Sequence, residues 1–96
     1  MDKQPCVYIL NSINKNVLYV GVTSDLAGRI WQHKNKVAEG FTQKYYVNRL
    51  VYFKLHSSME ETILKEKLLK RWRRVWKDKL ISDFNPKWKD LGSELY

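Results

Sequence analysis

Residues 7–21 read VYILNSINKNVLYVG, two short apolar runs on either side of an asparagine-rich segment. Runs rich in β-branched and aromatic residues around such a gap predict a β-hairpin. Each run carries one tyrosine, Tyr8 and Tyr19. A turn centred between Ile13 and Asn14 would place the two tyrosines directly opposite each other on one face, whereas a one-residue slip would separate them. On the hairpin alone, they are most simply interpreted as an aromatic pair that stabilises the sheet.

The length and composition of the chain indicate one small globular domain. Its 96 residues are 44% hydrophobic and 14% aromatic, enough for one modest core. The single cysteine, Cys6, excludes an internal disulfide and a cysteine-based zinc cluster. Because there is no apolar run typical of a signal peptide or a membrane span, we expect a soluble, cytoplasmic protein without membrane contact.

The net charge of +8 points to an anionic partner, nucleic acid above all. The charge is concentrated in residues 65–79, which contain eight basic residues against the two acids Glu66 and Asp78. A solvated helix face would also explain this run. At this density we favour contact with a phosphate backbone, which predicts salt-sensitive binding with little sequence preference.

A helix is expected directly after the hairpin, with Thr23, Ser24 or Asp25 as its cap. Its inward face is marked by residues at helical spacing, Leu26, Ile30, His33 and Val37. Arg29 shares one side of this helix with His33, four residues later. Taken alone, His33 is better interpreted as a histidine at the edge of the core than as a ligand.

A loop around Gly40 and a third strand from about Arg49 to His56 should follow. The third strand would complete a three-stranded sheet, because an isolated hairpin is only marginally stable in water. The fold class is therefore α+β, a three-stranded antiparallel or mixed sheet flanked by about three helices.

A second helical region begins with a predicted capping box formed by Ser58 and Glu61. Its predicted buried stripe consists of Leu64, Leu68, Trp72 and Val75, widened by Leu69 and Trp76. The pattern allows one helix as far as Ile81 or two helices that break near residues 71–73. Pro86 ends the helical region, and Trp88 and Leu91 could dock the tail onto the core.

Glu66 is an acid inside this basic region, and two interpretations of it are open. It could form an ion pair with Lys70 at i+4. It could instead hold a divalent cation beside phosphates that the basic residues bind. From the helix alone, the ion pair is the better interpretation.

The chain resembles the GIY-YIG nuclease superfamily, and more closely its small single-domain members, from about Val7 to Leu91. The two name-giving motifs correspond to Val7-Tyr8-Ile9 and Tyr19-Val20-Gly21. The departures from the superfamily pattern are the order Val-Tyr-Ile in the first motif and Val20 in place of isoleucine in the second. The other matching positions are Arg29, His33, residues 41–45, residues 50–53, Glu66 and the late segment Asn85-Pro86-Lys87-Trp88.

The resemblance implies a single nuclease domain over residues 1–96, with a core of about 6–91, that hydrolyses phosphodiester bonds in DNA using one Mg²⁺ or Mn²⁺. It implies the catalytic set Tyr8, Tyr19, Arg29, His33 and Glu66, with Glu66 as the metal ligand. Tyr8 would take a proton from the attacking water. Since a free phenol has a pKa of about 10, the site must lower that pKa or couple the phenol to a cation. Arg29 could do this while holding the phosphate.

The expected nucleic-acid contacts are Lys44, Tyr45, Lys67, Lys70, Arg71, Arg74 and Asn85, the last also as a group that orients the metal shell. We expect weak sequence specificity, or a separate protein partner that supplies the target. The alternative is a nucleic-acid-binding module for DNA or RNA that keeps the fold without catalysis. A third interpretation is an adaptor whose basic helix meets an acidic protein.

Overall fold

The computed structural model describes residues 4–14, 16–35, 40 and 44–95. The predicted Val37 and most of the loop at residues 41–45 lie outside these ranges. The elements, in chain order, are β1 (Cys6–Asn11), β2 (Leu18–Thr23), α1 (Leu26–Lys34), β3 (Arg49–Leu55), α3 (Met59–Arg71), α4 (Arg74–Phe84) and the 3₁₀ helix η1 (Leu91–Glu94).

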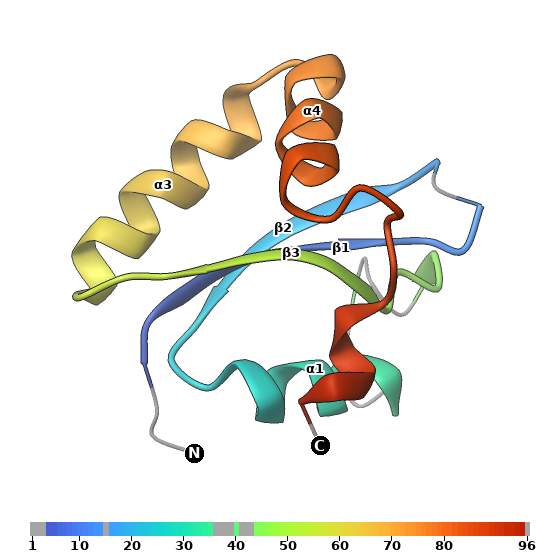
Figure 1. The fold of residues 1–96 in the computed structure, drawn as a ribbon. Coiled ribbons are helices and arrows are strands. Elements are labelled where there is room, and N and C mark those ends of the chain that lie inside the picture. Colours follow the sequence, from blue (N-terminus) through green and yellow to red (C-terminus); the bar gives the residue numbers. More distant parts are fainter. Residues whose placement is uncertain (1–3, 15, 36–39, 41–43, 96) are drawn as a thin grey trace.

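The strands form one sheet in the order β2-β1-β3, with both pairs antiparallel (Figure 1). This confirms the predicted α+β fold with a three-stranded sheet. All six residues of the central strand β1 are buried, because its two faces are covered by helices and its two edges by strands.

The register of the hairpin differs from the prediction. Tyr8 pairs with Gly21 and Leu10 with Tyr19, so the prediction of direct opposition was wrong. The reason lies in Ser12, whose backbone amide and hydroxyl both bond Val17, at 3.1 and 3.2 Å, and centre the turn one residue further along. This moves every cross-strand partner by two residues, which keeps both tyrosines on the same face.

A β-bulge interrupts the pairing of β1 with β3. Ile9 pairs with Tyr52 and Leu10 with Leu50, so Val51 is the extra residue. As a result, Val51 and Tyr52 both belong to the apolar cluster on one face of the sheet, while Phe53 packs against the cluster on the other.

Two apolar clusters lie on opposite faces of the sheet, and Figure 1 shows α1 on one side of the sheet and α3 and α4 on the other. One joins the sheet to α1 and includes Tyr8, Leu10 and Ile30. The other joins the sheet to α3 and α4 and includes Ile9, Leu69 and Ile81. The tyrosine face therefore looks toward α1.

The second helical region breaks at Trp72 and Arg73, which confirms the two-helix alternative. Its predicted buried stripe is mostly wrong. Leu69 is fully buried and Trp72 is partly buried, but four members of the predicted stripe are exposed: Leu64, Leu68, Val75 and Trp76. The break redirects the chain, so no single helical stripe can face the sheet over the whole region.

Side-chain caps fix the starts of two helices. Asp25 caps α1 by accepting a hydrogen bond from the Gly28 amide at 3.2 Å. Ser58 caps α3 by accepting from the Glu61 amide at 3.2 Å. The reciprocal half of the predicted capping box is replaced, because the Glu61 carboxylate accepts from the Ser57 hydroxyl at 2.6 Å instead.

The tail after α4 is fastened to both layers. Trp88 packs against the α3–α4 cluster and Leu91 against the α1 cluster, as predicted. Asp90 accepts hydrogen bonds from the backbone amides of Leu50 and Gly92 and pairs with Lys34, which ties α1 to β3. Burial raises the pKa of Asp90, but the bonds from Lys34 and the two amides outweigh burial and leave this pKa lowered.

Each helix within the described ranges is too short or too polar to cross a membrane.

Candidate active site

The two tyrosines form a diagonal pair on the α1 side of the sheet. Tyr8 comes from the central strand β1 and Tyr19 from β2, and their ring centroids are 6.3 Å apart with an interplanar angle of 45°. Tyr8 is 1% exposed, whereas Tyr19 is partly buried. The pair therefore has one member inside the core and one nearer to solvent.

Gly21 provides the space for both rings. A Cβ atom at this position would lie 2.6 Å from the Tyr8 hydroxyl and 2.9 Å from Cε2 of Tyr19. Contacts this short would force the rings to move, because the glycine backbone cannot give way without disturbing the sheet. The glycine of the Tyr-Val-Gly motif is thus required by the packing of the tyrosines.

Helix α1 presents Arg29 and His33 to the tyrosines, as their four-residue spacing predicts. The Tyr8 hydroxyl lies 3.2 Å from Nε2 of His33, and Arg29 Nε donates to the same hydroxyl at 3.4 Å. The His33 ring is also packed against both phenols, with centroid distances of 6.0 Å to Tyr8 and 5.9 Å to Tyr19. Four of the five predicted catalytic residues therefore meet at one place.

The ionisation of this cluster follows from burial. Burial raises the pKa of Tyr8 to about 12, and the hydrogen bond from Arg29 offsets only part of this rise. Burial, helped by the charge of Arg29, lowers the pKa of His33 to about 4. The bond to Tyr8, stronger than the opposing effect of burial, raises the pKa of Arg29. At neutral pH the site thus holds a neutral phenol, a neutral imidazole and a guanidinium cation.

The expected lowering of the phenol pKa is not what the protein alone produces. The physical reason is that Tyr8 is almost completely removed from water, which penalises the phenolate more than one hydrogen bond from Arg29 favours it. The second expected route, coupling of the phenol to a cation, has a structural basis in the hydrogen bond from Arg29.

Glu66 lies in the other helical layer, on α3, which packs over β2 and β1. Within the described part of the chain, its carboxylate contacts Lys70 Nζ at 3.3 Å and does not contact the tyrosine cluster. The Glu66 side chain is 17% exposed. The ion pair expected from the helix alone is therefore present, and Glu66 could meet the cluster only around the outer edge of β2.

The predicted nucleic-acid contacts are spread over the surface. Lys44 lies over the ring of Tyr45, 5.4 Å from its centroid, and both are exposed. Lys67 and Arg71 are exposed on α3. Arg74 bonds Asp78 at 2.7 Å and the backbone oxygen of Asn16 at 3.0 Å, so it also fastens α4 to the hairpin turn.

Asn85 is 6% exposed and its amide is used within the fold. It donates to the backbone oxygens of Val51 at 3.2 Å and Lys89 at 2.8 Å, and accepts from the Lys89 amide at 3.1 Å. This geometry supports a role in holding the loop after α4 against β3.

Sequence reasoning missed one residue that orients the cluster. Gln32 accepts a hydrogen bond from Nη1 of Arg29 at 2.9 Å and so helps to aim the guanidinium. Its position three residues after Arg29 on the same helix was the available signal.

The sequence is similar to those of known proteins. The sequence model of the GIY-YIG catalytic domain matches residues 4–79, and this match stops before the late segment at Asn85. Two UPF0213 proteins of Streptococcus pneumoniae, from the serotype 4 strain TIGR4 and from strain R6, are 29% and 28% identical over 83 residues. Each alignment covers 86% of this chain and 83% of the relative.

A solved structure has the same fold. The solution NMR structure of a UPF0213 protein from Bacillus halodurans matches with a TM-score of 0.53 and 30% identity, over 82% of this chain and 83% of that chain.

Proposed function

The chain belongs to the GIY-YIG catalytic domain family, and from this premise we propose that it is a divalent-metal-dependent endonuclease that hydrolyses phosphodiester bonds in DNA. One observation carries the proposal. Arg29 and His33 of α1 meet at the phenol oxygen of Tyr8 on β1, and the ring of Tyr19 on β2 packs beside Tyr8 and His33. A cluster built only for packing has no need of a guanidinium and an imidazole on the same hydroxyl.

The proton path follows from the ionisation states. Tyr8 takes a proton from the attacking water as its own phenol proton passes to Nε2 of His33, 3.2 Å away. His33 is neutral at pH 7, because its pKa is lowered to about 4, so the ring has a nitrogen lone pair for that proton; the same low pKa makes the protonated ring release it again readily. Arg29 stabilises negative charge on the phenol oxygen and, through its remaining N–H groups, on the phosphate. Tyr19 positions the phosphate or the water beside them.

Glu66 would be the single protein ligand of a magnesium or manganese ion. A single carboxylate, completed by water and phosphate oxygens, is a donor set that suits Mg²⁺. The Lys70 ammonium already pairs with this carboxylate at 3.3 Å, so a divalent ion would have to displace it. When bound there, a divalent ion would neutralise charge on the leaving oxygen. Because α3 packs over β2, the scissile phosphate would lie across the outer edge of β2, between Glu66 and Tyr19.

A cleavage assay tests the proposal. Purified protein with Mg²⁺ or Mn²⁺ should nick supercoiled plasmid or cut branched DNA. Glu66→Ala should abolish the cut with nucleic-acid binding nearly intact, and Tyr8→Phe should slow it about 10²- to 10⁴-fold, the usual contribution of acid–base catalysis. A wild type that cuts neither DNA nor RNA in any divalent metal, or a Glu66→Ala variant that cuts normally, would overturn it.

A second function is favoured by the position of Glu66. Its carboxylate is paired with Lys70 and separated from the tyrosines by the sheet, as would suit a module that binds DNA or RNA without cutting it. The two functions separate in the assay above, since the module binds with equal affinity before and after Glu66→Ala and never cleaves.

The expected partner is nucleic acid, consistent with a net charge of +8. Binding through phosphates gives weak sequence specificity, so we infer that target selection comes from nucleic-acid structure or from a separate protein. If the basic helices instead bind an acidic protein, that protein should still be pulled down with this chain after nuclease treatment. An intracellular location, where the substrate is found, goes with this proposal.

A further inference from the structure

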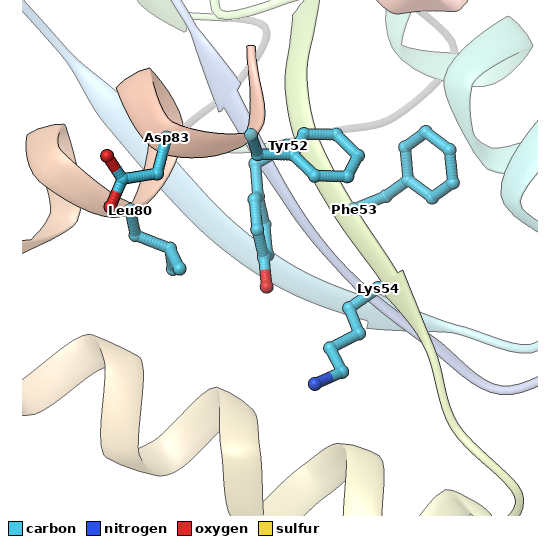
Figure 2. Close-up of a pocket in the computed structure, with 6 residues that line it drawn as sticks. Tyr52, Phe53, Lys54, Leu80 and Asp83 are labelled. Carbon is cyan, nitrogen blue, oxygen red and sulfur yellow. The ribbon is translucent and has the colours of Figure 1, made fainter.

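A pocket of about 430 Å³ lies outside the tyrosine cluster, between β3 and α4. It is lined by three residues of β3 and three of α4: Tyr52, Phe53, Lys54, Leu80, Asp83 and Phe84 (Figure 2). Its volume falls within the range of small-molecule sites.

Aromatic rings form one wall of this pocket. The Phe84 ring lies 5.0 Å from Tyr52 and 5.5 Å from Phe53, between centroids, with interplanar angles of 66° and 78°. Phe84 is nevertheless 46% exposed. The two neighbouring rings therefore fix its orientation while leaving part of its surface open to a flat ligand.

Tyr52 supplies a polar group that has no partner within the described chain. Its side chain is 5% exposed, and its hydroxyl makes no hydrogen bond with any described residue. Figure 2 shows this hydroxyl directed into the space beside Lys54. The hydroxyl faces the open space of the pocket, so it is available to a ligand as a donor and an acceptor.

Positive charge flanks the Phe84 ring. Lys54 lines the pocket, while Asp83, its acidic member, is paired with Lys79 at 3.2 Å. A second hollow of about 270 Å³ also borders Phe84 and is lined by Lys87 and Lys89. A ligand on the Phe84 ring would therefore have cationic groups on both sides.

We propose that the β3–α4 pocket binds one unstacked nucleobase of the nucleic-acid substrate. The base stacks on Phe84 and hydrogen-bonds the Tyr52 hydroxyl, and the flanking phosphates lie near Lys54 and near Lys87 and Lys89. Base–aromatic stacking beside a cationic track is how proteins hold single-stranded nucleic acid. The inference rests on the proposed function only in taking nucleic acid as the ligand.

The pocket lies at β3, the strand next to the one that carries Tyr8. Phe53, which contacts Phe84, is the cross-strand partner of Tyr8. Neighbouring strands lie about 4.8 Å apart, so the aromatic row Tyr8–Phe53–Phe84 runs from the cluster across the edge of β3 to the pocket.

Binding of an abasic oligonucleotide tests the inference. Fluorescence anisotropy in EDTA would compare a short single-stranded oligonucleotide with one of the same length that lacks all bases. Wild type should bind the abasic strand about 5-fold or more weakly, the value of one stacked base. Phe84→Ala should abolish this difference. Trp76→Ala, which removes another exposed ring from the same helix, should preserve it.

Tyr52→Phe tests the hydrogen bond without removing the ring. It should weaken binding of the normal strand about two- to tenfold and leave binding of the abasic strand unchanged. Circular dichroism and the abasic affinity together verify that each variant is folded.

Two results would overturn the inference. One is a wild type that binds the abasic and normal strands equally. The other is a preference for bases that survives Phe84→Ala and Tyr52→Phe, because the bases would then bind elsewhere.

The test is independent of catalysis, since EDTA removes divalent cations. A base preference located in the pocket without any cleavage would refute the nuclease but keep the pocket. Cleavage without a base preference would keep the nuclease and refute the pocket.

Discussion

Gly21 is the residue at which a single methyl group would disturb the tyrosine cluster most directly. Gly21→Ala would place a carbon 2.6 Å from the Tyr8 hydroxyl. We expect about 1–3 kcal/mol of destabilisation from overpacking. Cleavage by the folded fraction should fall on the order of 100-fold, because displaced reacting groups lose rate steeply. Urea unfolding and single-turnover cleavage measure the two effects.

Val22→Ala is the matched control for this variant. Val22 is the next residue of β2 and packs on the opposite face, against the α3–α4 cluster. The Val22→Ala variant should have a lower free energy of unfolding, while the cleavage rate of the folded protein stays near wild type. Equal losses of rate in both variants would contradict the role of Gly21.

His33 should make stability depend on pH. Its pKa is about 4 in the folded protein against 6.5 for the ordinary group, so the unfolded chain binds more protons between these values. The free energy of unfolding should be constant above about pH 6.5 and fall by on the order of 2–3 kcal/mol as the pH drops toward 4.

Urea unfolding at several pH values measures this slope. His33→Gln should flatten it, because glutamine does not titrate. A wild-type stability that does not change between pH 4 and 6.5 would contradict the burial of a neutral imidazole.

Lys70 competes with any cation for Glu66. Lys70→Met removes the ammonium at 3.3 Å, so Mn²⁺ should bind about two- to fivefold more tightly, the value of a partly exposed ion pair. Isothermal titration with Mn²⁺ gives the affinity. Lys67→Met, which removes a neighbouring exposed ammonium, serves as the control, and Glu66→Gln should lose the binding. Unchanged affinity in Lys70→Met would speak against Glu66 as the ligand.

The convergence of Tyr8, Tyr19, Arg29 and His33 could be predicted because short-range periodicity governs it. Alternation in the hairpin puts both phenols on one face, and helical spacing puts Arg29 beside His33. The position of Glu66 could not be predicted in this way. It depends on which face of the sheet α3 covers, and that is decided by the long-range packing of Leu69.

Among the elements, the faces of the hairpin could be predicted from the sequence pattern, but the buried face of the α3–α4 region could not. A two-residue error in register left the faces unchanged, because strands repeat every two residues. In α3 the exposed Leu64 and Leu68 compete with Leu69 for the buried side, and a polar residue, Thr62, is fully buried. Apolar periodicity alone could not choose among these faces.

The bulge at Val51 was also beyond prediction. Strict alternation would place Tyr52 with Leu50 on the α1 side, but the extra residue turns Tyr52 toward α4. The β3–α4 pocket exists because of this change. A bulge of one residue cannot be recognised from the hydrophobic pattern of the strand itself.

The loop after α4 is held against β3 by one buried amide, that of Asn85. Asn85→Ala removes three hydrogen bonds of a buried amide and leaves backbone groups unsatisfied. It should lower the free energy of unfolding by about 2–3 kcal/mol. Ser82→Ala, which removes an exposed contact with Trp88, should cost less than about 1 kcal/mol.

The same variant separates structure from binding. If Asn85 acts only through the fold, nucleic-acid affinity per folded molecule stays at the wild-type value in anisotropy measurements at low temperature. A loss of affinity without a loss of stability would make Asn85 a direct contact instead.

Over the whole molecule, the basic charge should govern affinity. The logarithm of the binding constant should fall linearly with the logarithm of salt concentration, and each phosphate contact removed should reduce the slope by about 1. Lys67→Gln combined with Arg71→Gln should therefore reduce it by about 2 and weaken all sequences alike.

Lys79→Gln is the control for this charge effect. Lys79 is paired with Asp83 at 3.2 Å, so part of its charge is already offset and the slope should change less. Anisotropy titrations across a salt series measure the slopes. Binding that is insensitive to salt would exclude phosphate neutralisation as the main source of affinity.

The complete burial of β1 has a consequence for how this protein can change over evolutionary time. Alternate residues of this six-residue strand are constrained in different ways. Tyr8 belongs to the proposed site on the α1 side, whereas Val7 and Ile9 pack under α3 and α4. Having neither a solvent face nor a free edge, β1 offers no position at which drift is harmless. New specificity would therefore arise at the exposed rims of β2 and β3, around a central strand that stays the same.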